Sequence, residues 1–185
     1  MLKINIDADE YYDRTTGEFI DIEPVTLCLE HSLLAISKWE AKYCKAFLSS
    51  EKSNAEIMDY IRMMTFAPED VDPNVYIYMP EDKIGEIQRY IESPMTATTF
   101  SDAKKRQESR EFITSELVYY WMTANSIPFS CETWPLPRLL TLIHICGIKN
   151  NPDSYKKSNK KLTSSAIARR KALNDARRAQ HGTSG

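Results

Sequence analysis

Residues 112–150 read FITSELVYYWMTANSIPFSCETWPLPRLLTLIHICGIKN, and this stretch decides the fold that we expect. Apolar side chains occupy nearly every side of its first half, which is typical of a helix that is buried all round. A break follows at residues 125–130, where Pro128 has no backbone N–H to donate, and a second apolar segment runs from Leu136 to Ile148. We therefore expect a helical hairpin at the centre of the core, with Gly147 near its end.

Two short segments near the N-terminus have the pattern of β-strands. Residues 2–6 alternate apolar and polar side chains, as a half-buried strand does, and residues 19–22 offer a second strand. Gly17 lies between them, in a segment suited to a tight turn. These signals predict a small β-hairpin within residues 1–26 that packs on the rest of the protein.

Helical periodicity dominates the segment between this hairpin and the central stretch. It begins near Glu30, and residues 53–56 then match a capping box that opens a second helix, ending before Pro68. Residues 68–80 hold three prolines and predict a loop or a brief extended piece, whereas residues 81–92 return to helical spacing. The expected fold is mainly α, with a helical bundle over residues 27–150.

The composition is that of one globular domain with an appended segment. The chain has 185 residues, of which 42% are hydrophobic and 27% are charged. No apolar run approaches the roughly 20 residues that span a bilayer, and the first residues do not open a signal peptide. We expect a cytoplasmic protein with no membrane contact.

The charge is distributed unevenly along the chain. Residues 151–185 hold nine basic and two acidic residues, a formal charge of +7, whereas residues 1–150 hold 15 basic and 24 acidic residues, a charge of −9. Residues 166–179 are rich in helix formers but carry only a thin apolar stripe, so a basic C-terminal helix is expected that becomes stable mainly by docking. The residues expected to contact a partner are Lys160, Lys161, Arg169, Arg170, Lys171, Arg177 and Arg178.

Several partners suit such a basic segment. It is either a docking arm for an acidic protein or a nucleic acid, or a tail that folds back on its own body or on a neighbouring copy. Nucleic-acid binding needs only clustered Lys and Arg, so it stays open as a less favoured alternative. Acidic faces on the body would accept the tail of a second copy and produce an oligomer, unless these charges serve only solubility. The acidic residues concerned are Asp13, Asp21, Glu23, Glu69, Asp70, Asp72, Glu81 and Asp82.

The sequence carries no signature of catalysis. Neither the P-loop pattern nor the dinucleotide-binding pattern of glycines occurs. Glu30, His31 and Ser32 are adjacent, but neighbours in a helix point in different directions, so a role at the start of a helix is favoured over a catalytic triad. The cysteines stand far apart in apolar stretches, which favours buried free thiols. We expect no enzyme activity, no cofactor and no metal site. The cysteines are Cys28, Cys44, Cys131 and Cys146.

Five segments together resemble a known group of phage proteins. They are LEHSLLAISKWEAKY (29–43), PMTATTF (94–100), ITSELVYYWMTANSIPF (113–129), LPRLLTLIHICGIKN (136–150) and ARRKALNDARRAQHGTSG (168–185). In this order they resemble small proteins encoded among the tail genes of long-tailed bacteriophages, which are commonly described as tail assembly chaperones. The resemblance covers nearly everything after residue 26.

The resemblance implies a non-enzymatic protein of the host cytoplasm. Such chaperones are thought to coat the long, hydrophobic tape measure protein until tail tube protein polymerises around it, and this role implies a helical body and oligomerisation. The expected partners are therefore the tape measure protein, possibly the tail tube protein, and further copies of this chain. A structural virion protein of the head, neck or tail is the main alternative.

Overall fold

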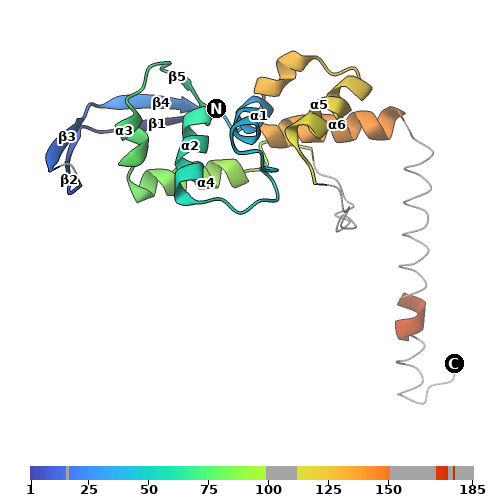
Figure 1. Ribbon diagram of the computed structural model, residues 1–185. Coiled ribbons are helices and arrows are strands. Elements are labelled where there is room, and N and C mark those ends of the chain that lie inside the picture. The colour runs from blue at the N-terminus through green and yellow to red at the C-terminus, as the bar shows by residue number, and fades with distance from the viewer. Residues whose placement is uncertain (16, 99–111, 151–169, 175–176, 178–185) are drawn as a thin grey trace. The chain divides into compact units, whose positions relative to one another are not determined.

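The computed structural model describes residues 1–15, 17–98, 112–150, 170–174 and 177. Contacts between residues divide the chain into two units, Met1–Ile143 and His144–Gly185. The strands all lie in the first unit, and Figure 1 labels them in chain order. They are β1 (Leu2–Ile6), β2 (Asp9–Asp13), β3 (Glu18–Ile22), β4 (Val25–Leu29) and β5 (Thr65–Ala67).

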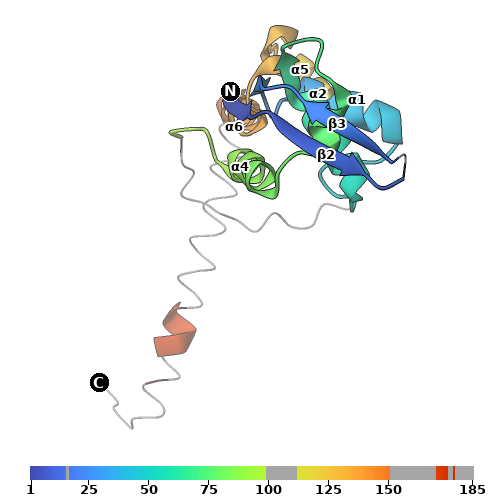
Figure 2. The same ribbon diagram turned by 90° about the vertical axis from the view of Figure 1, so that its left-hand side faces the viewer.

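The first four strands belong to one long β-hairpin. β1 pairs antiparallel with β4, and β2 pairs antiparallel with β3, and the register does not change across the unpaired residues between them. Pro24, which cannot donate a ladder hydrogen bond, stands in this break. At the turn Gly17 has a φ of 75°, a conformation that glycine adopts without steric cost, and its N–H donates to the Asp13 carbonyl at 2.8 Å. Figures 1 and 2 show β2 and β3 as the outer half of this hairpin.

The inner half of the hairpin is completed by a third strand. β5 pairs antiparallel with β4, which gives the order β1-β4-β5 and places β4 in the middle. Ile4, Leu27 and Leu29 are almost fully buried on this sheet. The small sheet is thereby anchored in the core of the first unit, whereas β2 and β3 form a separate two-stranded sheet.

Helix α1 packs against three of the other helices. It contacts α2, α5 and η1, and its Trp39 is completely buried, with the indole N–H donating to the Glu56 carbonyl at 3.1 Å. The helices are α1 (Leu33–Tyr43), α2 (Asn54–Met64), α3 (Pro73–Ile77), α4 (Glu81–Glu92), α5 (Ser115–Ala124), the 3-10 helix η1 (Phe129–Thr133) and α6 (Leu136–Asn150).

The local signals for helix ends act as the sequence predicts. Ser32 caps α1 by accepting the N–H of Ala35, and Ser53 and Glu56 form both hydrogen bonds of the capping box of α2. α1 ends at Cys44, which adopts the left-handed conformation with a φ of 52°. The expected helix over residues 81–92 is confirmed with the same bounds.

The prediction of a mainly α fold is wrong, because the structure mixes helices with two antiparallel sheets. The hairpin expected within residues 1–26 does exist, but it continues to Leu29, into the residues 27–150 where a helical bundle was expected. Strand β4 was missed because its buried residues, Leu27 and Leu29, lie only a few positions before the apolar residues of α1. In the sequence they look like the beginning of the apolar pattern of that helix. The strand β2 was missed because it is mostly acidic and exposed.

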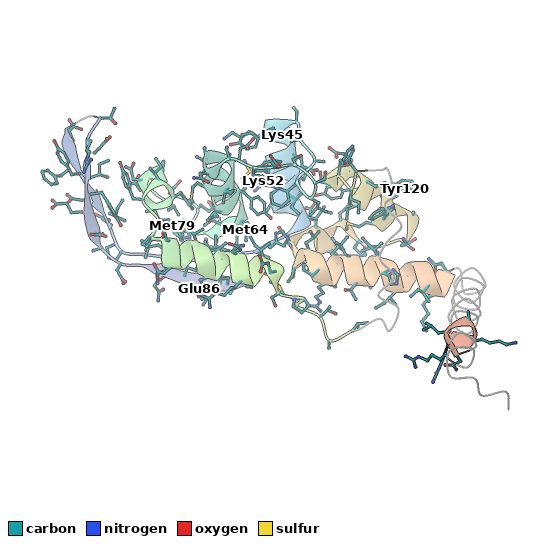
Figure 3. All side chains as sticks on the ribbon, turned by 90° about the horizontal axis from the view of Figure 1, so that it is seen from below. Lys45, Lys52, Met64, Met79, Glu86 and Tyr120 are labelled. Atoms are coloured by element: carbon teal, nitrogen blue, oxygen red, sulfur yellow. The ribbon has the colours of Figure 1, made fainter. Side chains whose placement is uncertain are left out.

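The prediction of a central hairpin formed by residues 112–150 is also wrong in its details. Tyr120 is 65% exposed and lies on the outer side of α5, so this helix is not buried all round (Figure 3). Gly147 lies inside α6 rather than at its end, and the segment 68–80 contains the short helix α3. Cys131 is a buried free thiol as expected, but Cys44 is exposed.

Candidate protein-binding surface

The basic residues predicted to contact a partner are only partly described. Residues 170–174 and 177 are helical, and Arg170, Lys171 and Arg177 are exposed. Arg170 and Leu173 are three residues apart within the described helical residues, and Leu173 is also exposed. Lys160, Lys161, Arg169 and Arg178 lie outside the described residues.

A cleft of about 590 Å³ lies in the first unit, and its apolar lining is the clearest binding feature there. The start of α1, the end of α2 and strand β5 form its walls, and they contribute Leu34, Met63 and Phe66. Phe66 is 52% exposed. A cleft of this volume is large enough to take one or more apolar side chains of a partner.

The direct passage from α2 into β5 explains why Phe66 faces outward. Thr65 follows α2 at once in an extended conformation, and strand alternation then turns Thr65 inward and Phe66 outward. The Thr65 hydroxyl donates to the Ile61 carbonyl at 3.0 Å and accepts from the Tyr76 hydroxyl at 3.1 Å. The N–H of Glu30 donates to the Met64 carbonyl at 2.9 Å, which fixes the end of α2 beside the sheet. The position of Phe66 is therefore set by its neighbours.

Charged groups of both signs also line the cleft. Glu30 forms an ion pair of 2.6 Å with the amino group of Met1 and accepts the hydroxyl of Tyr90 at 2.8 Å. Burial and the bond to Glu30 raise the pKa of Tyr90, so its hydroxyl stays protonated at neutral pH. Lys38 and Glu69 line the cleft as well, and both are exposed. The cleft thus offers both apolar and charged groups to a partner.

A cluster of rings supports the α1 wall from behind. The His31 ring nitrogen Nδ1 lies 2.6 Å from the Tyr60 hydroxyl, and the rings of Phe47 and Tyr60 are 4.2 Å apart. Burial lowers the pKa of His31 to about 4, so its imidazole is neutral at pH 7. Lys52 lies with its ammonium group 4.3 Å from the centre of the Phe47 ring (Figure 3). These packed rings hold the helix start rigidly and leave the adaptable Met63 at the surface.

A second exposed apolar surface occurs at the outer half of the hairpin. Tyr12 and Phe19 are directly paired across β2 and β3, their ring centres lie 5.1 Å apart, and they are 55% and 66% exposed. On the opposite face of the same strands, Tyr11 stacks on Tyr78 at 4.9 Å. Only one face of this two-stranded sheet therefore packs on other side chains of the described chain.

The expectations about metal and membrane can be compared only with the described part of the chain. Within those ranges, no group of three or more His, Cys, Asp or Glu side chains is placed so that it could hold a metal ion. The helices formed by the described residues include none that is both long and apolar enough to cross a bilayer.

Comparisons of the chain with protein family models, with curated proteins and with solved structures found no match.

Sequence reasoning missed the cleft because its lining comes from separate segments. Leu34, Met63 and Phe66 lie on three different elements, and none of them belongs to a recognisable motif. The one local signal is the short apolar run before Pro68, where a helical pattern ends in an aromatic residue. The run Thr65–Ala67 is too short for an alternating pattern to identify it as a strand.

Proposed function

We propose that this protein is a non-enzymatic assembly chaperone of a phage tail, which binds an apolar segment of the tape measure protein. The observation that carries the proposal is the cleft that is lined by the exposed Phe66 and by the half-buried Met63 and Leu34. The sequence resemblance to proteins of the phage tail region supports the choice of partner, and the cleft supports a role in binding another polypeptide.

The lining of the cleft suits an amphipathic helix. Such a helix binds by placing apolar residues of one face into a groove, and Met63 and Phe66 supply the complementary apolar contact. Methionine adapts to side chains of different shapes, as a chaperone for a long and varied partner requires. Lys38 and Glu69, which also line the cleft, allow polar residues on the flanks of the bound helix to form charged contacts.

The proposal is tested by capture of the tape measure protein expressed together with the tagged full-length chain. We expect the wild-type chain to retain the tape measure protein in soluble form, and the Phe66→Ser variant to retain at least about tenfold less, since several kcal/mol of apolar contact would be lost. Tyr120→Ser is the matched control, because Tyr120 is exposed to a similar extent but lies on α5, outside the cleft.

Two results would contradict the proposal. One is the absence of any complex between the wild-type chain and the tape measure protein at micromolar concentration. The other is equal capture by the wild-type chain and the Phe66→Ser variant, provided that circular dichroism shows both to be folded. Mass spectrometry of infected-cell lysate and of purified particles adds a further test, because a chaperone of the host cytoplasm is expected only in the lysate. Stoichiometric presence in particles would favour the structural virion protein.

A further inference from the structure

The outer half of the hairpin presents an aromatic pair framed by carboxylates. Strand alternation places Glu10 and Tyr12 of β2 on the same face as Phe19 and Asp21 of β3. Tyr12 and Phe19 pair directly at a ring distance of 5.1 Å, and all four side chains are exposed. We call these four residues the hairpin face.

The carboxylates of this region are placed against one another. Glu10 lies directly opposite Asp21 on the hairpin face, whereas the pair of Asp13 and Glu18 lies on the other face of the sheet. Like charges directly opposite each other destabilise an antiparallel pair, and a two-stranded sheet is marginal in stability on its own. Residues 9–22 contain five acidic residues and one basic residue, Arg14. A cationic group bound over the hairpin face would relieve this repulsion.

The chemistry of the face selects an arginine-bearing segment. A guanidinium group stacks on aromatic rings and also binds carboxylates in a bidentate manner, whereas a lysine ammonium is a strongly hydrated point charge. An apolar neighbour of the arginine would cover Tyr12 and Phe19, which are 55% and 66% exposed. The partner segment should therefore combine arginine with an apolar residue on one side.

The described part of the basic segment has this combination. Leu173 and Arg177 are four positions apart in the sequence, a spacing that corresponds to about 6 Å along the axis of an α-helix. The pairs Tyr12/Phe19 and Glu10/Asp21 are two residues apart along their strands, which is about 6.7 Å. A helix with Leu173 against the aromatic pair therefore brings Arg177 to the acidic pair.

We propose that the hairpin face binds the basic C-terminal segment of a second copy of this chain, so that the copies associate tail to hairpin. Each copy carries both partners, since residues 1–150 have a formal charge of −9 and residues 151–185 one of +7. Pairing of two hairpin faces with each other is disfavoured, because it would bring the acidic residues of both copies together. The proposal concerns association of this chain with itself, and it does not depend on binding of the tape measure protein.

Charge reversal in trans tests the proposal with the full-length protein. In sedimentation velocity at low salt, the wild-type chain should associate in a concentration-dependent manner. The double variants Glu10→Lys/Asp21→Lys and Arg170→Glu/Arg177→Glu should each weaken this association at least about tenfold. Mixing the two variants should restore it, because the reversed tail of one then meets the reversed hairpin of the other. The first variant keeps two like charges opposite each other, so the hairpin itself is not further strained.

A matched control separates a specific contact from a change in net charge. Glu51→Lys/Glu92→Lys alters the net charge by the same amount at exposed positions outside the hairpin, and it should associate like the wild-type chain. A wild-type chain that stays monomeric at micromolar concentration, or a mixture of the two reversed variants that does not associate, would overturn the proposal. Equal weakening by the control would overturn it as well.

Discussion

Glu40 offers the sharpest test of how the helical part of the protein is held together. Its buried carboxylate lies on α1 and accepts two backbone hydrogen bonds, one from the N–H of Phe47 at 2.7 Å and one from the N–H of Ser115 at 2.6 Å. Ser115 is the first residue of α5, where a negative charge also interacts favourably with the helix dipole. A single side chain thus connects α1 to the loop that follows it and to a helix 75 residues away in the sequence.

The expected loss of stability on mutation of Glu40 follows from these two hydrogen bonds. Hydrogen bonds to charged groups contribute about 1.5–3 kcal/mol each, so Glu40→Ala should lower the free energy of unfolding by about 3–6 kcal/mol. That loss approaches the whole stability of many domains, so Glu40→Gln is the more informative variant. The amide oxygen of glutamine can accept one N–H, but its NH₂ group then faces the other N–H, and we expect a loss of about 1.5–3 kcal/mol.

Urea unfolding followed by circular dichroism measures the effect, and amide hydrogen exchange locates it. Exchange of the Ser115 and Phe47 amides should accelerate in Glu40→Gln more than exchange elsewhere in the core. Glu51→Gln is the control, because Glu51 is exposed and should change the stability by less than about 0.5 kcal/mol. The reasoning is refuted if Glu40→Gln unfolds with the same free energy as the wild-type protein and leaves both amides equally protected.

Three further predictions concern stability. Burial lowers the pKa of His31 from 6.5 to about 4, so the unfolded chain takes up a proton more readily than the folded protein. Acidification from pH 6.5 to 4 should therefore lower the free energy of unfolding of the wild-type protein by up to about 3 kcal/mol, and His31→Phe should not show this loss. Equal pH dependence of the two proteins in urea unfolding would contradict this prediction. The bond from Lys45 and those from Ser53 lower the pKa of Glu56 from 4.5 to about 2, so its contribution is complete above pH 4.5 and is lost as the pH falls toward 2. Between pH 4.5 and 2, the melting temperature of Glu56→Gln should depend less on pH than that of the wild-type protein, and equal dependence on pH would count against the role of Glu56. Gly85→Ala should raise the stability by about 1 kcal/mol, because an added Cβ meets no atom within 4 Å inside α4, and a lower melting temperature would show a contact that the structure lacks.

The parts of the fold that the sequence predicted are those fixed by neighbours in the chain. The capping box of Ser53 and Glu56, the turn at Gly17 and the helix over residues 81–92 each depend on residues a few positions apart. The missed β4 is defined by pairing with β1 and with β5, and the latter lies more than 30 residues further along the chain. Neither partner strand is a near neighbour of β4 in the sequence, and a helix signal begins only a few residues after β4, so its own short pattern was read as part of that helix.

The error about α5 has a different physical cause. Tyrosine counts as apolar in a periodicity pattern, but its ring carries a hydroxyl group that can reach solvent or a polar partner. Tyr119 donates its hydroxyl to Glu132 at 2.6 Å, and Tyr120 is exposed. A run of aromatic residues therefore indicated a buried helix where the structure has one that is partly open to solvent.

Of the candidate binding surfaces, the sequence predicted the charged residues but not how they are arranged. The basic residues after Asn150 stand out in the composition, and Asp13 and Asp21 were noted as possible acidic contacts. That Glu10 and Asp21 oppose each other beside an aromatic pair depends on the strand register, which the sequence pattern did not provide. Phe66 likewise became a candidate only when folding brought α1, α2 and β5 around one cleft.

The continuous register of the long hairpin has a consequence for how this protein can change in evolution. Because β2 and β3 continue the register of β1 and β4 in a separate sheet, two residues can be inserted into or removed from each strand near the turn without disturbing the three-stranded sheet. Changes in steps of two keep the same side chains outward, whereas a change of one residue turns the outward side chains inward. The length of the outer half of the hairpin can thus change while the three-stranded sheet stays the same.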